Sequence, residues 1–116
     1  MQIQINTDDN VEGRDALARR VEAEVDATLG QFGGRLTRVE VHLSDENAGR
    51  ARAVDKRCLM EARPAGRQPV AVTHQAATLG EAYSGAAAKL RNLLESAFGR
   101  LDDTKGAASI RDNERR

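Results

Sequence analysis

The chain is poor in aromatic residues, cysteine and long apolar runs. Its 116 residues include one Tyr, two Phe and no Trp, which disfavours a protein that reads single-stranded nucleic acid by stacking bases on rings. Cys58 is the single cysteine, so no internal disulfide can form and a reducing compartment is favoured. No segment approaches the roughly 18 apolar residues of a membrane span, and the first residues lack a signal-peptide pattern. We therefore expect a cytoplasmic protein that does not associate with membranes.

Sequence signatures of catalysis are also missing. The chain has no nucleophile turn with a Ser/His/Asp set, no phosphate-binding loop and no Rossmann glycine fingerprint. Its only soft metal ligands are Cys58, His42 and His74, which do not form the close pairs of a structural zinc site. Cys58 is better interpreted as a small residue packed in the core. We expect no enzymatic activity, no cofactor and no metal site.

The charges cancel overall but are segregated along the chain. Eighteen basic residues balance eighteen acidic ones. Residues 1–53 contain seven basic and ten acidic residues, and residues 54–116 contain eleven basic and eight acidic residues. The basic residues are densest over residues 50–67, where only Asp55 and Glu61 oppose Arg50, Arg52, Lys56, Arg57, Arg63 and Arg67. Such a stretch either protects exposed strand edges from aggregation or contacts phosphate groups. The sequence favours neither explanation over the other.

The order of hydrophobic periodicities predicts the fold. Alternating apolar residues with period two indicate strands, and spacings of three and four indicate helices. The predicted elements are strands at 2–6, 36–44, 56–63 and 69–75 and helices at 14–31 and 79–101. This βαβββα order indicates an α+β domain in which two helices pack on one face of a four-stranded sheet. The other face of the sheet is left to solvent or to a partner.

Local signals refine this prediction. We expect Asp8, Asp9 or Asn10 to cap the first helix and a glycine at 30, 33 or 34 to end it. Thr78 and Glu81 form a predicted capping box at the second helix. Residues 1–101 make one domain, and residues 102–116, which lack an apolar period, are predicted to form a flexible polar tail. The predicted core contains Ile3, Ile5, Leu17, Val21, Val25, Leu29, Val39, Val41, Met60, Leu90 and Leu94.

Four stretches resemble a known family. They are Met1-Gln-Ile-Gln-Ile5, the helix entry at residues 10–17, the segment Phe32-Gly-Gly-Arg-Leu-Thr-Arg-Val-Glu-Val-His-Leu43 and the final helix at residues 76–90, with its Lys-Leu pair. Together they cover residues 1–101 in the family's order. The chain resembles the short form of the ribosome hibernation promoting factors and ribosome-associated inhibitors, also known as sigma-54 modulation proteins.

The resemblance implies a fold and a function. The fold would be like that of double-stranded-RNA-binding domains, and the protein would occupy the mRNA and tRNA channel of the small ribosomal subunit, silencing translation in starved cells. Contacts with ribosomal RNA in the family come from Lys and Arg on helices and strand ends. The corresponding residues here are Arg35, Arg38, Lys89, Arg91, Arg100 and Lys105, to which the basic stretch adds Arg57.

The chain also departs from the family. The later part of the first helix, often lysine-bearing in the family, carries Glu22, Glu24 and Asp26. Because a neutral protein releases fewer counterions from RNA, we expect weaker binding or a narrower binding patch. The C-terminal dimerising domain of the long form is not expected. The acidic helix motivates an alternative, in which a protein-interaction module keeps the fold, no longer binds the ribosome and docks partners on the open sheet face.

The helical wheel relates the basic residues of the second helix. Lys89 and Arg91 diverge by about 200° around the axis, whereas Arg100 returns almost into register with Lys89 at 3.6 residues per turn. We predict that Lys89 and Arg100 follow one RNA backbone and that Arg91 points toward the sheet edge.

Overall fold

Four strands form one mixed sheet in the order β1-β2-β3-β4. The computed structural model describes residues 1–8, 11, 13–45 and 56–110, with side chains up to residue 99. β1 (Gln2–Thr7) pairs in parallel with β2 (Leu36–Asp45). β3 (Lys56–Pro64) and β4 (Val70–Ala76) add antiparallel neighbours. Because each strand matches its predicted range within one residue, the period-two pattern located all four.

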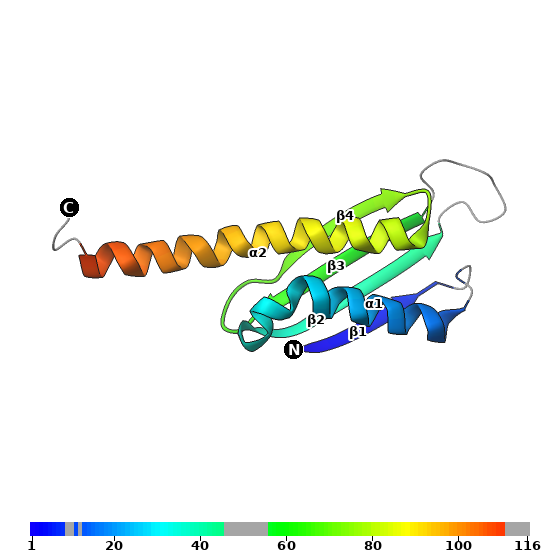
Figure 1. Cartoon of the computed structure of the whole chain (residues 1–116), viewed down its shortest axis with the longest axis horizontal. Coiled ribbons are helices and arrows are strands. Elements are labelled where there is room, and N and C mark those ends of the chain that lie inside the picture. Colours follow the sequence, from blue (N-terminus) through cyan, green and yellow to red (C-terminus); the bar gives the residue numbers. More distant parts are fainter. Residues whose placement is uncertain (9–10, 12, 46–55, 111–116) are drawn as a thin grey trace.

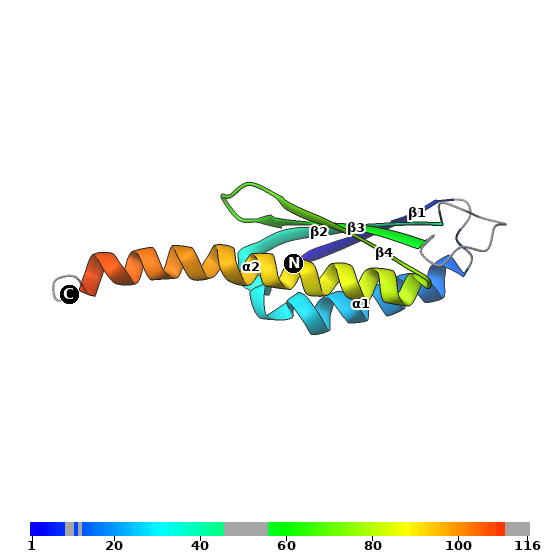
Figure 2. The ribbon, with the colours of Figure 1, turned by 90° about the horizontal axis from the view of Figure 1, so that it is seen from above.

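Two helices cover one face of this sheet (Figure 2). α1 (Arg14–Leu29) buries a residue at every fourth position, from Leu17 to Leu29. A short 3-10 helix, η1 (Gly30–Arg35), leads from α1 into β2. α2 (Leu79–Ile110) lies beside α1 and projects past the end of the sheet (Figure 1). The predicted βαβββα architecture is confirmed. Within the described residues, no helix is both long and apolar enough to cross a membrane.

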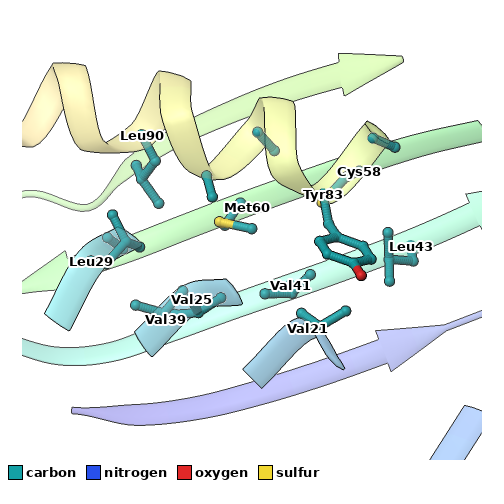
Figure 3. Packing of buried hydrophobic residues seen from close by; sticks show 14 of the residues in the cluster. Val21, Val25, Leu29, Val39, Val41, Leu43, Cys58, Met60, Tyr83 and Leu90 are labelled. Atoms are coloured by element: carbon teal, nitrogen blue, oxygen red, sulfur yellow. The ribbon is translucent and has the colours of Figure 1, made fainter. Parts of the chain in front are cut away.

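The core lies between the sheet and the helices (Figure 3). Val39, Val41 and Leu43 of β2 are opposite Ala62, Met60 and Cys58 of β3, and all six are buried. Leu90 and Leu94 of α2 complete this layer. The other predicted core residues are buried too, except that Ile3 and Ile5 on the edge strand β1 are half-buried and pack against the cluster.

The helix ends differ in part from the predictions. Gly13, not Asp8, Asp9 or Asn10, is the N-cap of α1; its φ of 65° is a left-handed conformation that glycine tolerates. Asp8 instead accepts a hydrogen bond from the Asp45 backbone N–H at 3.3 Å, while Asp9 and Asn10 lie outside the described residues. Gly30 stays right-handed because the chain continues into η1.

At α2 the predicted cap is present but the predicted end is wrong. The Glu81 backbone N–H donates to the Thr78 hydroxyl at 3.1 Å, as expected for an N-cap. The helix, however, continues to Ile110 instead of ending at Leu101. Residues 102–110, predicted as part of a polar tail, are therefore helical, and residues 111–116 lie outside the described part of the chain.

Candidate nucleic-acid interface

Arg38 lies in an ion-pair cluster on the open face of the sheet. Its guanidinium is 2.5 Å from the Glu40 carboxylate, which Arg63 of β3 approaches to 3.7 Å. His42 Nε2 lies 3.4 Å from the same carboxylate. Arg63 also contacts Glu61 at 3.3 Å. The positive charge of Arg38 and Arg63 is therefore largely compensated within the sheet face.

The cluster sets the protonation of Glu40. Partial burial raises the pKa of this carboxyl, but the hydrogen bond with His42 and the charges of Arg38 and Arg63 lower it by more. The net result is a pKa below the usual 4.5. Glu40 is consequently ionised at neutral pH, and it places a negative charge on the open face of the sheet.

Arg57 occupies the opposite end of the open face. It is opposite Ser44 on β2 and Gln75 on β4, so about 20 Å of strand separates it from the row of Arg38. A shallow pocket of about 370 Å³ lies here, lined by Asn6, Thr7, Asp8, His42, Leu43, Ser44, Arg57 and Leu59. The two predicted arginines of the sheet thus share a face but do not form one patch.

Lys89 and Arg91 lie on opposite flanks of α2. The Lys89 ammonium donates to the carbonyl oxygen of Thr73 on the edge strand β4 at 3.0 Å. Arg91 is one turn before Glu95, whose carboxylate accepts a hydrogen bond from Gln31 in η1 at 3.4 Å. Arg91 therefore lies on the flank toward α1 and η1, and the expectation that it points to the sheet edge is wrong. Lys89 takes that position.

Arg35 lies where η1 ends, against the aromatic ring of Phe98 on α2. Its Cζ atom is 3.8 Å from the ring centroid, and the Cζ of Arg67, in the turn between β3 and β4, is 6.0 Å from the same centroid. Arg67 was part of the predicted basic stretch but not of the predicted site. Only the fold shows its proximity to Arg35, because 32 residues separate the two in sequence.

The remaining predicted residues are placed by backbone alone or not at all. Arg100 and Lys105 lie on the helical backbone of α2 beyond the described side chains. Arg50 and Arg52 of the basic stretch lie outside the described residues. The predicted basic residues do not form a continuous positive stripe, because Arg38 and Arg57 are on the open sheet face whereas Lys89 and Arg91 flank α2.

Among the described residues, no three His, Cys, Asp or Glu side chains are grouped so that they could hold a metal ion. Cys58 is fully buried, and its burial raises the pKa of the thiol to about 12 even though the Arg57 charge opposes the shift. The thiol stays protonated at neutral pH and is a poor ligand and nucleophile. Cys58 packs as a small apolar residue, as the sequence indicated.

Comparison with known proteins agrees with the fold. A family model described as "Sigma 54 modulation protein / S30EA ribosomal protein" matches residues 3–102. The N-terminal domain of Thermus thermophilus Protein Y superposes with a TM-score of 0.67 at 23% identity, over 83% of this chain and 98% of that one. A ribosomal subunit interface protein from Coxiella burnetii gives 0.63 at 12% identity, over 85% and 99%. A search of curated proteins found no match.

The family match covers most of the chain. The protein therefore belongs to the sigma-54 modulation protein / S30EA ribosomal protein family, as the resemblance indicated. At their low identities, the two solved structures establish the shared fold.

Proposed function

We propose that this protein is a cytoplasmic ribosome-associated translation inhibitor, a hibernation or stress factor that binds the small subunit at the mRNA and tRNA channel. The family match over residues 3–102 carries the proposal. The description of the similar Coxiella burnetii structure as a ribosomal subunit interface protein supports an association with the ribosome. The mechanism is occupancy: the folded domain fills the channel and no bond is made or broken.

Phosphate contacts supply the affinity. The proposed RNA-binding residues are Arg35, Arg38, Arg57, Lys89, Arg91, Arg100 and Lys105. Phosphate contacts fix position without reading sequence, which suits a protein that recognises a fixed RNA shape. Because Glu40 compensates Arg38, we assign the larger contributions to α2 and to Arg35.

The helix α2 supports this assignment geometrically. It is continuous from Leu79 to Ile110, so Lys89 and Arg100 stand about 16 Å apart along one side of a single rod. Two successive cations at this spacing can follow one RNA strand. The hydrogen bond of Lys89 to Thr73 is exposed, and its ammonium can exchange that carbonyl for a phosphate oxygen.

The test is sedimentation with ribosomes from stationary-phase cells at low and at moderate salt. We expect the protein in the small-subunit and whole-ribosome fractions at low salt. Less protein should be bound at moderate salt, because the release of counterions from RNA then contributes less to the binding free energy. Absence from the small subunit under both conditions would refute the proposal. Equal recovery with the isolated large subunit would refute the assigned site.

The second candidate is a protein-docking module of the same fold. It is favoured by the open sheet face, where Glu40 and Glu61 already pair with Arg38 and Arg63, and by the acidic end of α1. It predicts one stoichiometric protein partner in a ribosome-depleted extract, with binding abolished by Glu40→Lys. A partner unaffected by Glu40→Lys would exclude docking on this face.

A further inference from the structure

Two arginines from distant parts of the chain converge on one aromatic ring. The Cζ atoms of Arg35 and Arg67 are 3.8 Å and 6.0 Å from the centroid of Phe98. The two Cζ atoms are therefore at most about 10 Å apart, and a small inward rotation of the two long side chains brings both guanidinium groups onto one phosphate group. Both side chains are exposed to solvent. The arrangement concentrates positive charge at the end of the sheet from which α2 projects (Figure 1).

The Phe98 ring under the two arginines is buried and packed against a second ring. Phe98 is only 5% exposed and its ring centroid lies 5.5 Å from that of Phe32. The backbone around it is tied as well, since the Ala65 N–H donates to the Arg35 carbonyl at 2.9 Å. Arg67 Nη1 reaches the Ala97 carbonyl at 3.4 Å. Both arginines are thus held by tertiary contacts, which reduces the side-chain entropy lost on binding a ligand.

Stacking on a ring suits a guanidinium for phosphate binding. In such a stack, a ring meets the flat face of a guanidinium, while the five N–H groups lie in the guanidinium plane and point outward from its edge. Arginine binds phosphate through this edge, often with two parallel hydrogen bonds. An arginine held on Phe98 therefore keeps the geometry that a phosphate requires.

The cluster borders an open cleft. A cleft of about 760 Å³ lies between the β3–β4 turn and α2, lined by Pro64, Gly66, Arg67, Gln68, Pro69, Val70 and Ala97. Gly66 has a φ of 71°, which lets the turn bend sharply and present Arg67 toward α2. A nucleic-acid backbone can enter this cleft without moving the core.

We propose that Arg35 and Arg67, seated on Phe98, form a phosphate-binding pair that holds one phosphodiester of an RNA backbone. The proposal rests on the proposed ribosome binding and adds a defined anchor to it. Arg67, which the family resemblance did not indicate, becomes a binding residue. The arginine pair lies at Phe98, farther along α2 than Lys89. Phosphate contacts at Lys89 and at the arginine pair would together fix the direction of α2 against the RNA.

The competing explanation is purely structural, with the arginines covering an aromatic ring. The experiment compares wild-type protein with three double variants: Arg35→Gln with Arg67→Gln, Arg35→Lys with Arg67→Lys, and Arg19→Gln with Arg20→Gln. The last pair is the control, because both of its arginines are exposed on α1. Affinity for purified small subunits is measured over a series of salt concentrations, and thermal unfolding is recorded for each variant.

The glutamine pair at 35 and 67 should weaken binding by roughly a hundredfold at low salt, about tenfold for each charged hydrogen-bonding contact. It should also reduce the slope of log affinity against log salt by roughly 0.7 to 0.9, the value for the one phosphate that the pair holds. The variant with lysine at both positions should keep the same salt slope, because its charge is unchanged. It should lose affinity severalfold, because an ammonium does not stack on a ring and does not form two parallel hydrogen bonds to phosphate. The control should stay within about twofold. Equal losses in the control and the glutamine pair, or an unchanged glutamine pair, would overturn the proposal.

A second arm separates this proposal from the ribosome proposal. The same variants are titrated with a plain RNA duplex of about 20 base pairs, longer than the footprint of one domain. If wild-type protein fails to bind ribosomes but binds the duplex through Arg35 and Arg67, the ribosome proposal fails and the phosphate pair stands. If neither RNA shows a loss specific to this pair, the phosphate pair is wrong.

Discussion

Gly85 of α2 and His74 of β4 approach so closely that no side chain fits between them. A Cβ atom on Gly85 would lie 2.2 Å from Cδ2 and 2.3 Å from Nε2 of the His74 ring. This contact brings α2 down onto the edge strand, where Lys89, one helical turn later, reaches the Thr73 carbonyl. The position of the basic flank of α2 therefore depends on a glycine in the middle of a helix.

Gly85→Ala should destabilise the domain although alanine is the better helix former. Helix propensity alone favours alanine by about 1 kcal/mol, but the imidazole must move out of the way, at a cost of about 1–3 kcal/mol for an overpacked site. We expect a net loss in the free energy of unfolding, measured by urea denaturation. Gly99→Ala is the matched control, since no atom lies within 4 Å of its Cβ, and it should be neutral or stabilising. If Gly85→Ala stabilised the protein as much as Gly99→Ala does, the close approach would be wrong.

The buried thiol of Cys58 should make stability fall at alkaline pH. Its pKa rises from 9.0 to about 12 in the folded state, so the unfolded chain loses its thiol proton first. The stabilisation that comes from burying the protonated Cys58 thiol is complete below pH 9 and is lost as pH rises toward 12. The stability advantage of wild type over Cys58→Ala should narrow by about 1.4 kcal/mol per pH unit above pH 9. Urea denaturation at successive pH values measures it, and parallel curves for the two proteins would contradict the assigned burial.

Replacing Glu40 by Gln should have opposite effects on stability and on RNA binding. The pKa of Glu40 is lowered, so its ionised form stabilises the fold above the usual pKa, and this contribution disappears as pH falls through the lowered value. Wild type should therefore exceed Glu40→Gln in stability at neutral pH, with the difference shrinking in acid. RNA affinity should rise, because Arg38 and Arg63 lose the carboxylate that they share, and only Arg63 keeps another, that of Glu61. Unchanged affinity would show that RNA does not contact the open sheet face.

Charge reversal on α2 should weaken ribosome binding more than charge reversal on α1. Lys89→Glu with Arg100→Glu places two negative charges along one side of the helix proposed to follow the RNA. The matched control is Arg19→Glu with Arg20→Glu, which changes net charge by the same amount on α1. We expect a loss at least tenfold greater for the α2 pair, with both proteins still folded by circular dichroism. Equal losses would mean that the binding face is misassigned, and no loss from either pair would favour protein docking.

The sequence was sufficient for the elements and the core because both depend on local hydrophobic period. Helix ends were less predictable. No proline lies between Asp102 and Ile110 to stop a helix that has already formed, so α2 continues through Gly106 although its apolar period ends. The helical wheel of α2 gives the angle between Lys89 and Arg91. It does not show which flank of α2 faces α1, because that depends on how the two helices lie on the sheet. The meeting of Arg35 and Arg67 on Phe98 depends on three separate segments, and no local pattern encodes it.

The most direct test of the central claim is competition on the small subunit. Purified small subunits carrying a fluorescent mRNA and a tRNA are titrated with the protein at low salt, and the bound fraction of each RNA is followed together with that of the protein. Occupancy of the channel predicts that one protein molecule binds each subunit and that mRNA and tRNA are released in proportion. Stoichiometric binding that leaves both RNAs in place would contradict the account.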